Sequence, residues 1–299
     1  MQQWIKNTLG SIVFFTLLAG FSRLFDTQTK GFRASNITPV SSFDEQWEPS
    51  LPYSANDSLE IQRVLNAPFY FLARGGSSDV FHSEDNQYVI KFFKAHRIHP
   101  PAWAYSKIAR FLIPYGCEQI INKREAQKKL QFTSYKMAFE SLQNQTRVVY
   151  LHLNPTTHHK NLITFYDNIG IKHSVSADQT AFVLQKKASS FSLYLKNLLL
   201  ENNIEGAKLL LSQFASFMKE RAIKKIYDGD ITPRYNLGMI DHSLMIFDID
   251  QLRLRETELT LLEHMLKDAN EMFLWLERKS PELVLFLKEE ISLLSNQNE

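Results

Sequence analysis

The 299-residue sequence predicts an α+β fold in which a small antiparallel sheet precedes a mainly helical region, with a hydrophobic helix at the N-terminus. Residues 69–93 contain three short apolar segments separated by a glycine-rich turn and a polar turn, which is typical of strands. Residues 122–142 are dense in good helix formers and contain neither Gly nor Pro. Residues 7–22 form an uncharged, largely apolar run.

The composition is that of a folded protein with a substantial core. Hydrophobic residues make up 44% of the chain and aromatic residues 12%, which argues against extended disorder. The net charge of +2 is the small difference between 34 basic and 32 acidic residues, so nothing global indicates nucleic acid as a partner. The single cysteine, Cys117, excludes an intrachain disulfide framework.

The N-terminal segment, residues 1–25, is predicted to be a signal anchor or a signal peptide. Its apolar run is long for a signal-peptide core and short of the roughly 20 apolar residues that span a bilayer. Small residues at Ala19, Gly20 and Ser22 permit cleavage, and a core helix is the alternative. The sequence therefore predicts membrane association through this segment, or export. Residues 26–60, rich in Ser, Thr, Asn and Pro, are expected to be a linker.

The first half of the folded part begins with a predicted three-stranded meander. Residues 69–72, a segment starting at Val80, and residues 88–93 are the strands, and Gly75 and Gly76 lie in the first connection. Small residues let a backbone come close to a phosphate group, although an isolated Gly-Gly turn is weak evidence. Lys91 stands at the centre of the third strand, where it is either an edge lysine or a ligand-binding one.

The elements predicted after Lys91 contain fewer residues with catalytic or ligand-binding chemistry. An insertion at residues 95–118 is expected to be a helical flap or a lobe-covering element, and core packing is favoured over ligand binding for its aromatic residues. The helix at residues 122–142 comes next, and then strands at 148–151, 162–166 and 181–185. Helices are predicted at 191–200, 207–223 and 256–277, and another begins at Ser280-Pro281.

The stretch with the most chemistry lies between these helices. Asp228-Gly229-Asp230 opens a loop that ends at Asn236, and a predicted hairpin then leads to Asp248. An aspartate that accepts a hydroxyl proton, together with Asn and Asp oxygens that hold Mg²⁺, is what phosphoryl transfer requires. A loop of Asp, Gly, Pro and Asn is by itself more often only a turn.

Taken together, these segments resemble the protein-kinase-like superfamily in their order along the chain. Gly75 matches the central glycine of its phosphate-covering loop, with Gly76 beside it, and Val80 matches the valine that packs on adenine. Lys91 follows Val80 by eleven residues and matches the phosphate-binding lysine. The resemblance implies a bilobal fold, with an N-lobe at 61–187 and a reduced helical C-lobe at 188–299.

The catalytic loop is similar to that of aminoglycoside and other small-molecule kinases, which carry Gly-Asp at this point. The resemblance makes Asp230 the residue that orients or deprotonates the acceptor hydroxyl, and Asn236 and Asp248 the metal ligands. It implies ATP and Mg²⁺ as cofactors. Asp228 replaces the family's histidine, and five residues separate Asp230 from Asn236, one more than in the family.

Two further roles are implied by position. An acid in the helix after the lysine strand would pair with Lys91; Glu125 is favoured and Glu140 competes. The backbone from Gln185 to Lys187 would be the hinge that binds adenine. Ala73 and Ser78 replace the outer glycines of the phosphate-covering loop.

Three hypotheses remain. The chain is an ATP- and Mg²⁺-dependent phosphotransferase acting on a small molecule, lipid or sugar in preference to a protein. Alternatively, it is a catalytically impaired, membrane-tethered pseudokinase that serves as an interaction module with a protein partner, or an α+β domain with chance motifs. An active domain would be cytosolic, because ATP is scarce elsewhere.

Overall fold

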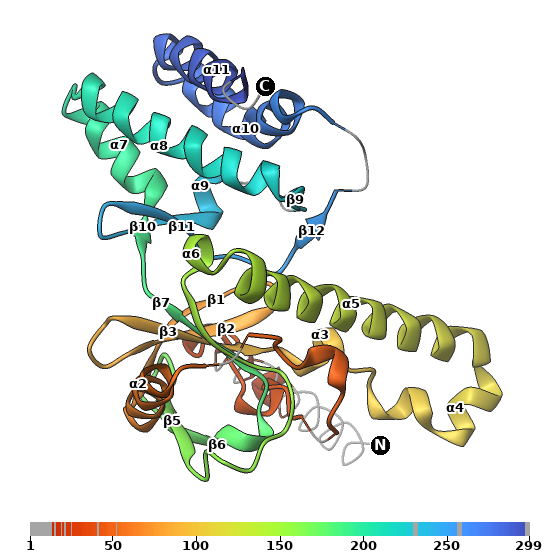
Figure 1. Cartoon of the computed structure of the whole chain (residues 1–299). Coiled ribbons are helices and arrows are strands. Elements are labelled where there is room, and N and C mark those ends of the chain that lie inside the picture. The colour runs from red at the N-terminus through yellow and green to blue at the C-terminus, as the bar shows by residue number, and fades with distance from the viewer. Residues whose placement is uncertain are drawn as a thin grey trace, which may run out of the picture.

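The computed structural model describes residues 14, 16–18, 20, 22–24, 26–40, 42–51, 53–229, 233–255 and 259–296. The molecule has two lobes (Figure 1). One contains a curled, mixed seven-stranded sheet, and the other is mainly helical. The long helix α5 (Pro114–Ser141) lies across the junction between them. This arrangement is compatible with a bilobal kinase-like fold.

The large sheet has the strand order β4-β7-β3-β2-β1-β5-β6. Strands β1, β2 and β3 form the predicted antiparallel meander, and β1 also pairs in parallel with β5. The hairpin of β5 and β6 thus widens the sheet beyond β1; β6 was absent from the sequence-based prediction because its residues are mostly polar. The strands are β1 (Phe69–Arg74), β2 (Ser78–Ser83), β3 (Tyr88–Phe93), β4 (Val148–His152), β5 (Leu162–Tyr166), β6 (Lys172–Ser176) and β7 (Phe182–Lys186).

Strand β3 is buried along its whole length, because both faces of the sheet are covered there. Ile90 and Phe92 belong to the apolar cluster that packs against helix α2 (Ala55–Asn66). Phe93 points to the other face, where its ring meets Phe132 of α5 at a centroid distance of 5.3 Å. Side chains alternate along a strand, so Lys91 faces α5 together with Phe93.

The N-terminal region differs from the expected linker. Residues 26–60 include two short 3-10 turns, Ala34–Asn36 and Glu45–Trp47, and the start of α2. Phe32 and Trp47 are buried, and Ile37 forms a β-bridge with Lys94. Phe32 packs on rings of the sheet and Trp47 on Phe132 of α5, so a few aromatic anchors fix this segment, and such isolated anchors produce no periodic signal in the sequence.

Most of the predicted signal or anchor, residues 1–25, lies outside the described residues. Within the described part of the chain, no helix has both the length and the apolar character needed to cross a bilayer.

The connection between β3 and β4 is helical throughout. The expected flap contains α3 (Ala95–Ile98), the 3-10 turn η3 (Ala102–Tyr105) and α4 (Lys107–Leu112). Helix α5 begins earlier than predicted, with Pro114 in its first turn, where the missing N–H of proline costs nothing. Helix α6 (Gln143–Thr146) then leads into β4.

In the helical lobe, α8, α10 and α11 pack against one another. The apolar cluster around Phe93 continues through α5 into these helices, so the two lobes share one core. The smaller strands lie between the lobes, and β9 and β12 were not predicted because each is very short. The helices are α7 (Phe191–Leu200), α8 (Ile204–Ile223), α9 (Pro233–Asn236), α10 (Leu261–Glu277) and α11 (Pro281–Asn296). The strands are β8 (Ser189–Ser190), β9 (Ile226–Asp228), β10 (Leu237–Ile240), β11 (Ser243–Ile246) and β12 (Leu252–Leu254).

Candidate functional site

Lys91 is a buried lysine in the middle of the sheet. Its neighbours across the ladder are Val80 on β2 and Val183 on β7, and only 5% of the residue is exposed. Its amine donates a hydrogen bond to the carbonyl of Phe247, just after β11. An amine in this position is not a solvated edge lysine, since burial of an ammonium group is costly without nearby anions.

Two carboxylates compensate the charge of Lys91. Burial lowers the pKa of Lys91, and the negative charges of Asp248 and Asp250 act in the opposite direction. Both carboxylates are half-buried, whereas Ile249 between them is completely buried. The alternation turns Ile249 into the core and leaves the two acids beside the amine.

Tyr135 of α5 completes this group of side chains. Burial raises the pKa of its phenol, and the charges of Asp248 and Asp250 raise it further, while a hydrogen bond with Ser78 opposes the shift. Lys91, Tyr135, Asp248 and Asp250 therefore lie within electrostatic reach of one another, and we call them the Lys91 cluster. Its members come from three distant parts of the sequence.

Helix α5 is tied directly to the segment that carries the two acids. The hydroxyl of Ser134 donates to the carbonyl of Ile249 and accepts a 2.7 Å hydrogen bond from the backbone N–H of Leu252. Gln131 lies one helical turn before Tyr135, is completely buried, and has no hydrogen-bond partner for its amide within the described part of the chain. Gln131, Ser134 and Tyr135 were not predicted as site residues, although polar residues within an apolar helical stripe are a recognisable signal.

The predicted catalytic loop is attached to the same segment at both of its ends. Strand β9 pairs with β12 so that Asp228 is opposite Leu252, and the N–H of Gly229 donates to Gln251 O at 2.9 Å. At the other end, the N–H of Phe247 donates to Asn236 O, also at 2.9 Å. Asp230 itself lies outside the described residues.

Asn236 is 6% exposed, and its amide nitrogen donates to Asp228 Oδ2 at 3.2 Å. The chain reaches this position through the single helical turn α9, which ends at Asn236. The carboxylate of Asp228 therefore orients the amide of Asn236. The oxygen is then the atom of Asn236 with the chemistry of a metal ligand.

The glycine turn between β1 and β2 is closed by a 2.9 Å hydrogen bond from Gly75 N to Ser78 O. Among the described glycines, left-handed backbone is found at Gly31 and Gly170 but not at Gly75 or Gly76. A Cβ at Gly76 would meet nothing within 4 Å, and one at Gly75 would lie 3.3 Å from Ser78 O. The turn therefore does not require glycine for its conformation. A phosphate-covering loop needs open space over such a turn. Any exposed turn has such space, so this observation does not distinguish the two.

Beneath this turn lies a buried acid with two cations. Asp79 is 1% exposed, and its carboxylate lies 3.5 Å from Lys94 Nζ and 3.6 Å from Arg74 Nε. Burial raises the pKa of Asp79, and both cations oppose that shift. Lys94 also donates to the carbonyl of Gly75, which fixes the base of the turn to the end of β3.

The predicted hinge makes different contacts from those expected of an adenine-binding backbone. The N–H of Lys186 donates to Arg147 O at 3.0 Å and that of Lys187 to Gln87 O at 2.8 Å. The buried side chain of Gln185 donates to the carbonyls of Thr146 and Ile246, at 2.6 and 2.8 Å. Gln185 therefore joins the sheet to the helical lobe, and two of the hinge donors already have protein partners.

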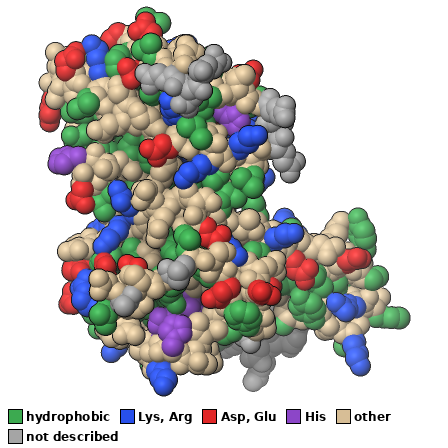
Figure 2. Space-filling model, in the orientation of Figure 1, with side chains coloured by type: hydrophobic (Ala, Val, Ile, Leu, Met, Phe, Trp, Pro, Cys, Tyr) green, Lys and Arg blue, Asp and Glu red, His purple; other side chains and the backbone are tan. Residues whose placement is uncertain are grey.

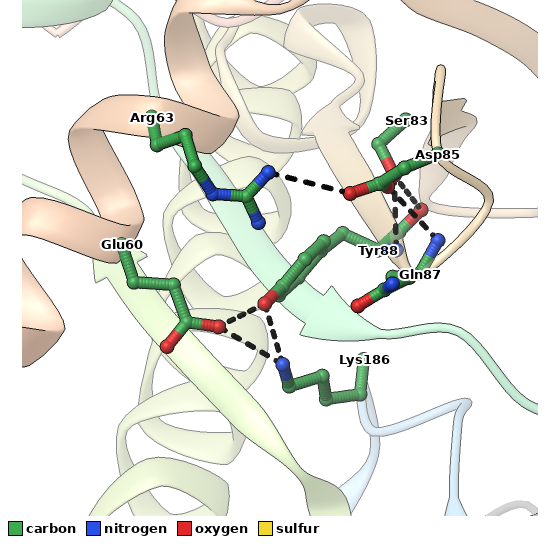
Figure 3. A network of polar contacts seen from close by, with 7 residues as sticks. All are labelled: Glu60, Arg63, Ser83, Asp85, Gln87, Tyr88 and Lys186. Atoms are coloured by element: carbon green, nitrogen blue, oxygen red, sulfur yellow. Dashed lines mark hydrogen bonds and ion pairs between the residues drawn. The ribbon is translucent and has the colours of Figure 1, made fainter.

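Figure 3 shows how the side chain of Lys186 holds α2 against the sheet. Its amine lies 3.0 Å from a carboxylate oxygen of Glu60 and donates to the hydroxyl of Tyr88, which in turn donates to Glu60. Arg63, also on α2, lies 3.5 Å from Asp85 in the turn between β2 and β3. These contacts fasten α2 and are directed away from the Lys91 cluster.

Glu125 is not brought to Lys91. It is exposed on α5, and no contact with the buried amine occurs among the described residues. The competing Glu140 accepts a 2.6 Å hydrogen bond from Ser50 N and lies 3.9 Å from Lys136. The physical reason is the register of α5, whose inward stripe contains Gln131 and Tyr135 where an acid was expected.

A second buried charge cluster supports the helical lobe. Asp268 of α10 pairs with Arg221 of α8 at 2.8 Å and with Arg255, just after β12, at 2.9 Å. The guanidinium of Arg255 lies 4.8 Å from the ring centroid of Tyr227. We call Arg221, Asp268 and Arg255 the arginine cluster; it holds β12, and through it β9, against the helices.

No protein-family model matches the chain. No match was found among curated proteins either. Among solved structures, a 2.2 Å crystal structure of WbdD has a TM-score of 0.38 and 13% identity, covering 76% of this chain and 46% of that one. A structure described as the bifunctional kinase-methyltransferase WbdD has a TM-score of 0.35 at 13% identity, covering 74% and 43%. Monomeric WbdD has a TM-score of 0.33 at 17% identity, covering 71% and 44%.

The chain thus spans less than half the length of the WbdD chains it matches. At these TM-scores and identities the likeness supports no conclusion about the fold or about the role of any residue. The strands and helices of the structure themselves show an α+β fold with a curled mixed sheet and a helical lobe.

Proposed function

We propose that this chain is an ATP- and Mg²⁺-dependent phosphotransferase of the kinase-like type, with an alcohol as acceptor. The observation that carries the proposal is the position of the buried Lys91 amine beside Asp248 and Asp250. The loop that contains Asp230 is hydrogen-bonded at both ends to the segment bearing these acids.

The side chains fit the two implied ligands. The carboxylate of Asp248 and the amide oxygen of Asn236 are hard oxygen donors, which Mg²⁺ prefers. Lys91 offers a cation to a phosphate group, and an anion there would favour its protonated form and reverse part of the effect of burial. When bound, the metal ion would neutralise charge on the triphosphate.

Each residue then has a defined task in the proposed reaction. Lys91 positions the phosphate groups, and Asp248 and Asn236 hold the cation. Asp230 orients the acceptor hydroxyl and accepts its proton, so its position matters more than its basicity. Ser134 is a positioning residue, since its hydroxyl holds α5 against the segment of the two acids, and Tyr135 stands within electrostatic reach of both carboxylates.

The acceptor is proposed to be a small molecule, lipid or sugar. Within the described residues after Asp248, the chain forms one short strand and the two helices α10 and α11, which offer little surface to hold a peptide. Membrane association through the N-terminal segment is part of the proposal, with the domain on the cytosolic side, where ATP is present.

A pseudokinase is the second candidate, and specific contacts favour it. The N–H groups of Lys186 and Lys187 donate to protein carbonyls, which removes two donors from adenine recognition. Glu125 is exposed and does not orient Lys91. In this version the chain keeps the fold as an interaction module without efficient phosphoryl transfer.

Thermal unfolding with and without Mg²⁺-ATP tests the proposal. A ligand at 100 times its Kd stabilises the folded state by about 2.7 kcal/mol, which shifts Tm by several degrees. We expect that shift in the wild type and in the control Lys267→Ala, on an exposed part of α10, and its loss in Lys91→Ala and Asp248→Ala. No shift at millimolar ATP would contradict the phosphotransferase, and binding without phosphoryl transfer would favour the pseudokinase.

A further inference from the structure

Residues 103–115 form an arm that displays large apolar side chains to solvent. Phe111 is 85% exposed, Ile108 73% and Tyr115 72%, and Phe111 has the highest exposure among the exposed large apolar side chains of the described chain. The other exposed members of the arm are Trp103, Tyr105, Leu112 and Ile113. The sequence-based prediction favoured core packing over ligand binding for the aromatic residues of this insertion, and the structure exposes Trp103, Tyr105, Phe111 and Tyr115.

The backbone of the arm is ordered by local contacts. The Ser106 hydroxyl caps α4 by accepting a 3.1 Å hydrogen bond from Ala109 N, and Pro114 starts α5. Ala104 and Cys117 are buried and anchor the base of the arm. In Figure 2 the arm, located by the position of α4 in Figure 1, projects from the body with hydrophobic and basic side chains at its tip.

The charge of this region has one sign. Residues 95–117 contain Arg97, Lys107 and Arg110 but no Asp or Glu, and the next acidic residue is the exposed Glu118 on α5, beyond the arm. Lys107 and Arg110 are exposed within the arm, and the guanidinium of Arg110 lies 5.7 Å from the ring centroid of Tyr105. Apolar and cationic groups are therefore presented together, and no carboxylate in this stretch would repel an anionic surface.

We propose that the arm docks on the surface of an anionic lipid bilayer. Phe111, Ile108 and Leu112 would enter the boundary between headgroups and acyl chains, while Lys107 and Arg110 bind lipid phosphates. Trp103, Tyr105 and Tyr115 have the amphipathic rings that favour the membrane–water interface. The proposal concerns a surface away from the Lys91 cluster and does not depend on the proposed function.

Several features favour a lipid surface over a protein partner. The apolar side chains are on a projecting tip, and insertion of a tip requires no complementary hollow on the other side. Basic residues with Trp, Phe and aliphatic residues on a short amphipathic element are the composition of interfacial membrane anchors. A purely cationic arm also matches the negative surface potential of anionic lipids.

The single cysteine allows a local test in the full chain. Cys117 is buried, so a cysteine introduced by Phe111→Cys can be labelled selectively with a fluorophore whose emission depends on polarity. Leu285→Cys is the matched control, because Leu285 is a 65% exposed leucine on α11 in the helical lobe. Ile108→Cys repeats the test if the first variant does not fold, as judged by circular dichroism.

The probe is a vesicle of phosphatidylcholine with about 30 mol% phosphatidylglycerol, compared with phosphatidylcholine alone. We expect a blue shift and a rise in emission at position 111 with the anionic vesicles, and no change at position 285. Adding Lys107→Glu and Arg110→Glu should weaken this response, as should high salt.

Three outcomes would overturn the proposal. The first is vesicle sedimentation without a change at position 111, because another segment would then be the anchor. The second is an emission change that rises with protein concentration in the absence of vesicles, which would make the partner a second copy of the chain. The third is no response to vesicles of either composition.

Discussion

The Lys91 cluster and the arginine cluster are both buried groups of charges, but they are built differently. In the arginine cluster, Asp268 forms direct ion pairs of 2.8 and 2.9 Å with two guanidinium groups, and all three residues are nearly inaccessible. In the Lys91 cluster, one buried amine faces two half-buried carboxylates, and its hydrogen bond goes to a backbone carbonyl.

This difference separates a structural charge group from one suited to ligands. Direct pairing of Asp268 fixes three elements of the helical lobe and brings the charges together without a further ion. In the Lys91 cluster the carboxylates are half-buried, and the buried amide of Gln131 on the adjoining helix stripe has no hydrogen-bond partner within the described part of the chain. A ligand can reach half-buried oxygens, whereas the nearly inaccessible groups of the arginine cluster are closed to it.

The largest effect is expected from Asp268→Asn. Loss of the carboxylate leaves two guanidinium groups buried without a counter-charge, so the free energy of unfolding should fall by about 3–5 kcal/mol. Urea denaturation measures the loss. The control is Glu205→Gln, which removes the exposed pair with Lys208 and should cost less than about 0.5 kcal/mol. Equal losses in the two variants would show that the arginine cluster is not structural.

An effect of intermediate size on the free energy of unfolding is expected from pH, through the buried neutral His152. Burial lowers the pKa of His152 to about 4, although the backbone carbonyl of Thr180 and the charge of Asp178 oppose this; His158 adds to the lowering. An unfolded histidine has a pKa near 6.5, so between these values the unfolded chain binds more protons and stability falls as pH falls. At pH 5 His152 alone should account for about 2 kcal/mol.

Urea denaturation at pH 7 and pH 5 measures this loss, and His152→Gln should reduce the difference between the two values. Burial also lowers the pKa of His159 to about 4. Since His159 remains in the variant, part of the difference in stability between pH 7 and pH 5 should remain. If the substitution left the difference in stability between pH 7 and pH 5 unchanged, His152 would take up its proton in the folded protein at the same pH as in the unfolded chain.

Lys91→Met should be less damaging than Asp268→Asn. The amine has one hydrogen bond, to Phe247 O, and the carboxylates beside it are half-buried and reach solvent. We expect a loss of about 1 kcal/mol in the free energy of unfolding, the size of one hydrogen bond. A loss as large as that of Asp268→Asn would make Lys91 a structural residue and weaken the comparison.

The smallest effect is expected at the contact between α2 and the hinge strand. Glu60 is partly exposed, so Glu60→Gln should cost about 0.5 kcal/mol although it removes the ion pair with Lys186. Hydrogen exchange at the C-terminal end of β7 measures it, and exchange should become modestly faster there. A global loss of stability would show that this network does more than fasten α2.

The sequence predicted well those elements whose signals are local. The strand at residues 88–93 and the helix at 191–200 have the bounds predicted for them. Residues 26–60 were misjudged, because Phe32 and Trp47 are isolated anchors whose burial depends on distant parts of the chain. The exposed Phe111 was misjudged for the opposite reason: an aromatic residue gives no local sign that nothing covers it.

The candidate site was predictable only in part. The roles given to Lys91, Asp248 and Asn236 stay predictions, although the structure brings the first two into electrostatic contact. The position of Glu125 could not be predicted, because in a 28-residue helix with polar residues on every face local sequence does not determine which one turns inward. Gln131 and Tyr135 are the residues that turn inward on this helix.

Calorimetric titration of the full chain with ATP, with and without Mg²⁺, tests the central claim most directly. The account predicts nucleotide binding that is strengthened by Mg²⁺ in the wild type, loss of the Mg²⁺-dependent part in Asp248→Asn, and much weaker binding in Lys91→Met. Binding that is equal in all three proteins, or no binding at millimolar ATP, would contradict the claim that Lys91 and Asp248 serve one nucleotide.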